Sequence, residues 1–178
     1  MGMRACSGAA SRWLQRSGLR PGDRLYVDQP LGDSLRGLRK LQAGARWDPA
    51  APDPELSAHL NPNPNLGLGV RLAAIPGVSA AMDLSDGLSR DLRSMALASG
   101  VTLRLRPDLE RDALQGGEDY ARCFGSSLSQ EKLEALLGVP LIPVAEALSR
   151  GPAPLLIYDG GKDHPVPDLA FDHFHPGS

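Results

Sequence analysis

One continuous segment in the middle of the chain constrains the fold more than any other. A strand-like run at 78–84 passes through Ser85-Asp86-Gly87 into residues 88–99, whose apolar side chains recur at helical spacing. Gly100 should end this helix, because glycine adopts the left-handed conformation of a helix terminus without strain. Residues 101–106 then alternate apolar and polar side chains, as a half-buried strand does. This segment predicts a strand, a helix and a second strand in succession.

The rest of the chain repeats this alternation of strands and helices. Further strands are expected at 25–27, 139–145 and 155–158, and further helices at 31–41, near 66–74 and at 129–138. The proline-rich stretch 43–64 is interpreted as a loop around one short helix, not as a domain boundary. Interleaved elements predict an α/β (α+β) sandwich, a mixed β-sheet covered by helices.

Composition limits the class of protein. The 178 residues are 42% hydrophobic but include only eight aromatic side chains, so we expect one aliphatic core. A net charge of −2 argues against nucleic-acid binding, and no apolar run approaches the ~20 residues that span a bilayer. Cys6 and Cys123 lie far apart and match no zinc-ligand spacing. A cytoplasmic protein without disulfide bonds is therefore expected.

The turn after residue 82 carries the most informative polar side chains. Asp83 and Asp86 stand three residues apart where a strand ends and a helix begins, and their carboxylates could hold Mg²⁺, which prefers hard oxygen ligands. Free N–H groups at the helix start could bind an anion. The alternative is that Ser85 or Asp86 is an ordinary helix N-cap. Asp91, one turn further along, is expected to tolerate loss of its charge better than Asp86.

Two further polar segments follow. Gly116-Gly117 precedes Glu118, Asp119 and Tyr120, and the glycine pair permits a tight backbone that a ligand could approach. The alternative for this segment is an acidic surface turn. The tail Asp172-His173-Phe174 lacks the spacing of a zinc site.

The motifs taken together resemble a known family. Those that carry the resemblance are Arg16-Ser17-Gly18, Pro21-Gly22-Asp23, Leu31-Gly32-Asp33-Ser34, His59 with Pro62 and Pro64, Asp83 to Leu88, Gly116 to Tyr120, and Asp172-His173-Phe174. In this order they resemble thiamine-monophosphate kinase, of the aminoimidazole ribonucleotide synthetase superfamily. The resemblance implies the fold of the carboxy-terminal domain of that superfamily. It also implies transfer of the terminal phosphoryl group of ATP to thiamine monophosphate, with Mg²⁺, to give thiamine diphosphate.

The resemblance also implies residue roles. Asp83 and Asp86 would be metal ligands, and Asp86 and Ser85 would be catalytic, with Ser85 against the substrate phosphate. Gly117, Glu118, Asp119 and Tyr120 would line the substrate pocket, and Arg16 would lie with Ser85 near the nucleotide phosphates. The sequence departs from the family at Asn65, where a basic residue is usual, and at Ala121, where an acidic one is. No Walker-type Gly-x-x-x-x-Gly-Lys-Ser/Thr motif occurs, which argues against a P-loop kinase.

The resemblance covers one domain of a two-domain enzyme. Residues 16–178 are expected to form a single carboxy-terminal kinase-type domain, and residues 1–15 a short leader or a remnant of a missing amino-terminal domain. That domain would complete the active site and form a homodimer in the complete enzyme, so the chain alone is expected to be an incomplete, inactive fragment. Thiamine monophosphate and ATP are the expected ligands, with no nucleic acid and no membrane. The alternatives are a sibling ATP-dependent synthetase and an inactive binding or assembly module.

Overall fold

The computed structural model describes residues 12–63 and 65–169. The tail 172–174 and Cys6 lie outside these residues. The strands in the described part are β1 (Arg24–Val27), β2 (Val78–Asp83), β3 (Thr102–Leu105), β4 (Arg122–Ser126), β5 (Ile142–Leu148), β6 (Leu155–Asp159) and β7 (Lys162–Pro165). Its helices are α1 (Asp33–Gln42), α2 (Pro54–Leu60), α3 (Leu66–Ala74), α4 (Leu88–Ser99), α5 (Arg111–Gln115) and α6 (Gln130–Leu137).

All the strands join one mixed sheet in the order β2-β4-β1-β5-β3-β6-β7. The neighbours pair antiparallel except β3 and β6, which are parallel. The prediction of a mixed sheet covered by helices is confirmed. Strand β4, which lies between β2 and β1, was not predicted, and neither were α5 and β7. The sequence of β4, Arg-Cys-Phe-Gly-Ser, has no regular alternation of apolar and polar residues, so its pattern gave no signal.

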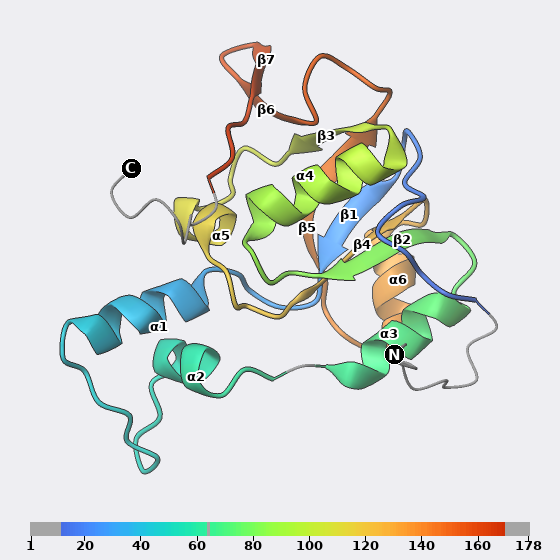
Figure 1. Ribbon diagram of the computed structural model, residues 1–178. Coiled ribbons are helices and arrows are strands. Elements are labelled where there is room, and N and C mark those ends of the chain that lie inside the picture. The colour runs from blue at the N-terminus through green and yellow to red at the C-terminus, as the bar shows by residue number, and fades with distance from the viewer. Residues whose placement is uncertain (1–11, 64, 170–178) are drawn as a thin grey trace, which may run out of the picture.

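Two apolar cores cover the two faces of the sheet. Successive residues of a strand point to opposite faces, and on β1 Leu25 and Val27 join one core while Tyr26 joins the other. The first core contains the inner face of α4, which lies across the sheet in Figure 1, and the second contains buried leucines of α3 and α6. Tyr26 and Phe124 add an aromatic pair with ring centroids 5.9 Å apart. The helices therefore form a layer on each side of the sheet.

Helix ends follow the local signals that the sequence contains. Gly100 and Gly138 end α4 and α6 with left-handed φ values of 68° and 65°. Asp53 and Ser129 cap α2 and α6 by accepting backbone N–H bonds. The expected loop around one short helix at 43–64 is confirmed, since α2 lies within it. Helices α1 and α2 pack on each other and project from one end of the sheet (Figure 1).

No helix in the described part of the chain has the length and apolar character needed to cross a membrane.

Candidate functional site

The candidate site forms where three strand ends meet. Strand β2 ends at Asp83 opposite Arg122, the first residue of β4, and β1 ends at Val27 opposite Cys123. The segments that extend from these strands must therefore share one end of the sheet. Two of these segments are named here. The carboxylate turn consists of Asp83 and residues 84–87, which follow β2, and the acidic segment is the stretch 116–120, which precedes β4.

Backbone hydrogen bonds join the carboxylate turn to the acidic segment. The N–H of Glu118 donates to the carbonyl of Ser85 over 3.0 Å, and the N–H of Tyr120 donates to the carbonyl of Leu84 over 3.0 Å. Gly117 lies so close that a Cβ atom there would stand 2.8 Å from the Ser85 carbonyl oxygen. Glycine at this position therefore allows the two backbones to approach closely. This close approach brings together the carboxylate turn and the acidic segment, two motifs found in the sequence.

The carboxylate turn presents its acidic side chains to solvent. Asp83, Ser85 and Asp86 are all exposed, and the Ser85 hydroxyl donates to Asp86 Oδ1 over 3.2 Å. Helix α4 has Gly87 at its N-cap, and within the described residues no side chain caps it. The alternative that Ser85 or Asp86 is an ordinary N-cap is therefore wrong.

The donor set of this turn fits a magnesium ion that also contacts a ligand. Mg²⁺ commonly takes one or two protein carboxylates and fills its remaining positions with water and substrate phosphates. Asp83 and Asp86 supply two such carboxylates. The described part of the chain contains no group of three or more His, Cys, Asp or Glu side chains arranged to hold a metal. These residues alone would therefore supply only part of a coordination shell.

A buried aspartate of α4 supports the turn from behind. Asp91 is 4% exposed, and its Oδ2 accepts hydrogen bonds from the backbone N–H groups of Ser85 at 3.0 Å and Asp86 at 3.1 Å. Burial raises the pKa of the Asp91 carboxyl to about 6. From its sequence position, Asp91 was expected only to tolerate loss of its charge better than Asp86. A signal was available, because Asp91 stands in helical register with the buried Leu88 and Met95.

The second buried carboxylate belongs to the acidic segment. Asp119 is 7% exposed, and its two oxygens accept from the backbone N–H groups of Gly32 at 2.9 Å and Ser34 at 3.3 Å. These bonds satisfy the amino-terminal end of α1, whose N-cap residue Gly32 has no side chain. Burial raises the pKa of Asp119. The side chain expected to contact substrate is thus engaged with α1, which it joins to the acidic segment.

The residues on either side of Asp119 have exposed side chains on a strained backbone. Glu118 and Tyr120 adopt positive φ values of 64° and 50°, which non-glycine residues rarely do. Such conformations cluster at functional sites. Glu118 Oε2 lies 3.8 Å from Nδ1 of His59 in α2, and this nitrogen lies 3.0 Å from Ser34 Oγ. The segment is therefore more than an acidic surface turn, because it contacts the carboxylate turn, α1 and α2.

The remaining predicted site residue lies on a different segment. Arg16 is exposed, and the carbonyl of the preceding Gln15 accepts from the N–H of Ala81 in β2. Within the described residues no hydrogen bond or ion pair joins Arg16 to the carboxylate turn. Of the two departures from the family pattern, Asn65 is the N-cap residue of α3 and Ala121 is fully buried in the first core.

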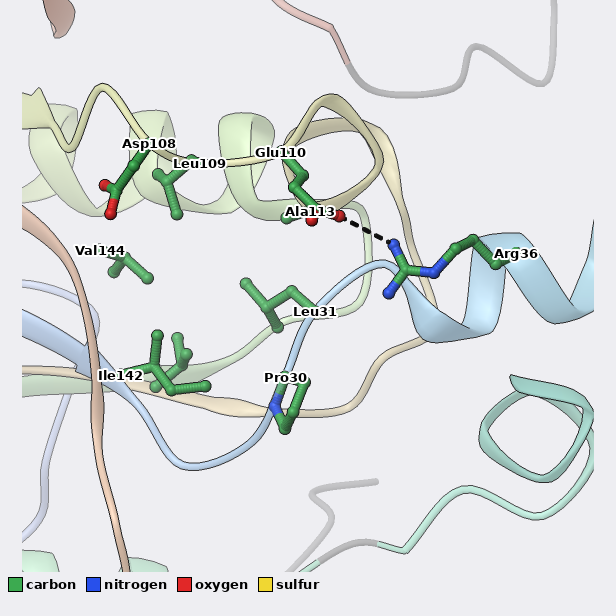
Figure 2. A pocket seen from close by; sticks show the side chains of 10 residues that line it. Pro30, Leu31, Arg36, Asp108, Leu109, Glu110, Ala113, Ile142 and Val144 are labelled. Carbon is green, nitrogen blue, oxygen red and sulfur yellow. Dashed lines mark hydrogen bonds and ion pairs between the residues drawn. The ribbon is translucent and has the colours of Figure 1, made fainter. Parts of the chain in front are cut away.

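A pocket of about 230 Å³ opens at the same end of the sheet but has a different lining. Figure 2 shows apolar side chains such as Leu31 and Val144 around it, with Arg36 and Glu110 at its edge. Arg36 also pairs with Asp33 and Glu55, so its charge is already compensated. None of the expected site residues lines this pocket.

Comparisons with known proteins identify relatives. No family model matches the chain. A thiamine-monophosphate kinase from Salmonella typhimurium (strain LT2) is 37% identical over 152 residues, which cover 75% of this chain and 46% of the relative. The chain therefore spans about half the length of the curated relatives it matches.

Solved structures agree with this result. The crystal structure of a thiamine-monophosphate kinase from Stenotrophomonas maltophilia K279a has a TM-score of 0.67 and 28% identity, covering 85% of this chain and 54% of that one. AaThiL, complexed with AMPPCP and TMP, has a TM-score of 0.66 and 24% identity over 86% and 52% of the two chains. Escherichia coli HypE, a hydrogenase maturation protein, has a TM-score of 0.70 and 18% identity over 93% and 55%.

The fold is that of the carboxy-terminal domain of the aminoimidazole ribonucleotide synthetase superfamily. Within that class the chain is a homologue of the thiamine-monophosphate kinases.

Proposed function

We propose that this chain serves the ATP-dependent phosphorylation of thiamine monophosphate to thiamine diphosphate. The observation that carries the proposal is the convergence of the carboxylate turn with the acidic segment at one end of the sheet. The 37% identity to a thiamine-monophosphate kinase supports it. The similar fold of AaThiL, whose structure was solved in complex with AMPPCP and TMP, supports it as well. Phosphoryl transfer depends on positioning and charge neutralisation more than on a strong base.

The carboxylate turn is the phosphate side of the proposed site. Asp83 and Asp86 would hold Mg²⁺, which would supply positive charge to the phosphates at this side of the site. Ser85 lies against the substrate phosphate, and its exposed hydroxyl can donate to that phosphate in place of its present bond to Asp86 Oδ1. Arg16 supplies positive charge toward the nucleotide phosphates.

The acidic segment is the acceptor side. Glu118 offers an exposed carboxylate to the cationic thiamine ring system, and Tyr120 offers an exposed aromatic ring beside it. Gly117 keeps the segment close to the carboxylate turn, so that acceptor and phosphate are neighbours. Asp119 contributes indirectly, because it anchors the segment to α1.

The chain acts in this proposal as one domain of a larger enzyme. Residues 16–178 form the carboxy-terminal kinase-type domain, and an amino-terminal domain completes the ligand shell and the homodimer. One metal ion held by the two exposed carboxylates, together with Arg16, supplies too little positive charge to neutralise the phosphates of ATP and of the acceptor. The complete enzyme is expected in the cytoplasm.

The two halves of the site can be tested separately by isothermal titration. Asp86→Asn should weaken binding of Mg²⁺ with AMPPCP while thiamine monophosphate binding is retained. Glu118→Gln should do the reverse, because it removes the charge that faces the thiamine and keeps the shape. Asp159→Asn, at an exposed position of β6, is the control. Equal loss of both ligands in either variant would contradict the division of roles.

A sibling ATP-dependent synthetase is the second candidate, since the fold is shared beyond the thiamine-monophosphate kinases, as the TM-score of 0.70 to HypE, a hydrogenase maturation protein, indicates. An assay of phosphate acceptors separates the two, because a sibling enzyme would not use thiamine monophosphate.

A further inference from the structure

We infer that Asp91 is a positioning residue for the carboxylate turn. Asp91 holds the backbone of Ser85 and Asp86 in place, so that the carboxylates of Asp83 and Asp86 can bind one metal ion. This inference rests on the proposed function, because it assumes that Asp83 and Asp86 bind a metal. Asp91 itself is buried and does not face the ligand.

Asp91 lies on a well-packed helix and accepts hydrogen bonds from two specific backbone groups. Its helix is anchored in the first core by Leu88, Leu92 and Met95, each of which is at most 1% exposed. Its Oδ2 accepts hydrogen bonds from the N–H groups of the consecutive residues Ser85 and Asp86, at 3.0 and 3.1 Å. Two bonds to successive peptide units restrain the path of the turn between the two candidate ligands.

The opposite side of the turn is held by other groups. Its carbonyls, those of Leu84 and Ser85, accept bonds from the acidic segment. Asp91 is the partner of the N–H groups of Ser85 and Asp86. Removing its acceptor would therefore leave two backbone donors without their partner, while the bonds to the acidic segment remain. The turn would loosen on the side where Asp86 projects.

The bonding pattern identifies informative substitutions. Leucine branches at Cγ as aspartate does, although it is larger, and it suits the apolar surroundings of α4, so Asp91→Leu removes the acceptor without burying another polar group. Asparagine retains one carbonyl oxygen, and one oxygen suffices, because Oδ2 alone accepts both bonds. Asp91→Asn should therefore rescue what Asp91→Leu loses. Ser89→Ala is the control, since Ser89 is fully buried in the same helix and its hydroxyl has no partner among the described residues.

The probe is Mn²⁺ in the presence of AMPPCP, and its affinity for the full chain is measured by titration. Loss of an outer partner of a metal ligand typically weakens binding by about 10- to 100-fold. We expect a weakening of this size in Asp91→Leu, near-native affinity in Asp91→Asn and no change in Ser89→Ala. Amide hydrogen exchange is the second readout, and protection should fall at Ser85 and Asp86 in Asp91→Leu alone.

The outcomes separate the inference from the proposed function. Native Mn²⁺ affinity in a folded Asp91→Leu, alongside weakened affinity in Asp86→Asn, would overturn the positioning role and leave the metal site standing. Affinity in Asp91→Asn as weak as in Asp91→Leu would also overturn it, because the charge and not the acceptor would then matter. Unchanged affinity in Asp86→Asn would reject the metal site, and the inference with it. If Asp91→Leu does not fold, Asp91→Ala replaces it under the same criteria.

Discussion

Two buried aspartates support the candidate site, and they differ in how they accept hydrogen bonds. Asp91 receives two backbone N–H groups on one oxygen, whereas Asp119 receives one on each oxygen. An amide side chain has one acceptor oxygen, and its nitrogen is a donor. The same substitution by asparagine therefore has different consequences at the two positions.

Asp119→Asn should destabilise the protein. One backbone N–H of Gly32 or Ser34 would face the amide nitrogen, and leaving a buried donor unpaired costs about 1–3 kcal/mol. Urea unfolding measures the change in the free energy of unfolding. Asp159→Asn, an exposed change of the same chemistry, should stay within about 0.5 kcal/mol of the native protein. An Asp119→Asn variant as stable as this control would contradict the capping role.

At the scale of elements, side chains cap three of the described helices, in two different ways. Helices α2 and α6 are capped by the residues that directly precede them, Asp53 and Ser129. Helix α1 is capped across the structure by Asp119. A cap close in sequence needs no distant segment to satisfy the helix start, whereas the start of α1 depends on the acidic segment being in place.

Two glycine substitutions should have opposite effects. Gly69 lies inside α3, and a Cβ atom there would have no neighbour within 4 Å among the described residues, so Gly69→Ala should stabilise the protein by about 0.5–1 kcal/mol. Gly117→Ala should destabilise it, because its Cβ would stand 2.8 Å from the Ser85 carbonyl oxygen. Thermal unfolding of both variants checks the signs. A stabilised Gly117→Ala would mean that the two segments can separate at no cost.

The thiol on β4 should be unreactive. Cys123 is fully buried in the first core, and burial raises the pKa of its thiol well above the usual value. Iodoacetamide should therefore label the peptide that contains Cys123 only after unfolding, as detected by mass spectrometry. Rapid labelling at neutral pH in the folded protein would show that β4 opens within the sheet.

At the scale of the whole molecule, the chain spans 46% of the length of the Salmonella relative. The proposed site is open, with Asp83, Ser85, Asp86 and Glu118 all exposed. Large exposed hydrophobic side chains occur on several elements, including Trp13 before β1 and Val70 on α3. An enzyme that neutralises several phosphates needs cations held on more than one side.

The purified chain should therefore show little or no kinase activity by itself. The measurement is a coupled assay of ADP release with thiamine monophosphate, with and without the amino-terminal half of a thiamine-monophosphate kinase relative. Activity should rise when that half is added. Turnover by the chain alone at ~1 to 100 per second, the usual range for kinases, would show that these 178 residues hold a complete site.

Local sequence patterns were sufficient for the elements with clear signals. The apolar face of α4, the alternation in β3 and the terminating Gly100 all predict structure within a few residues of themselves. β4 could not be found in this way, although it lies within the sheet. Its burial comes from its neighbours β1 and β2 and from both cores. A strand covered on both faces needs no alternating pattern.

The sequence by itself determined which residues could do chemistry, because carboxylates beside glycine at a strand end are visible as a local motif. Only the tertiary structure decided how they act. Sheet order placed the carboxylate turn against the acidic segment, and tertiary packing gave Asp91 and Asp119 their backbone hydrogen-bond partners. The physical reason is that side-chain chemistry is carried by each residue. Burial and hydrogen-bond partners instead depend on which distant segments the sheet brings together.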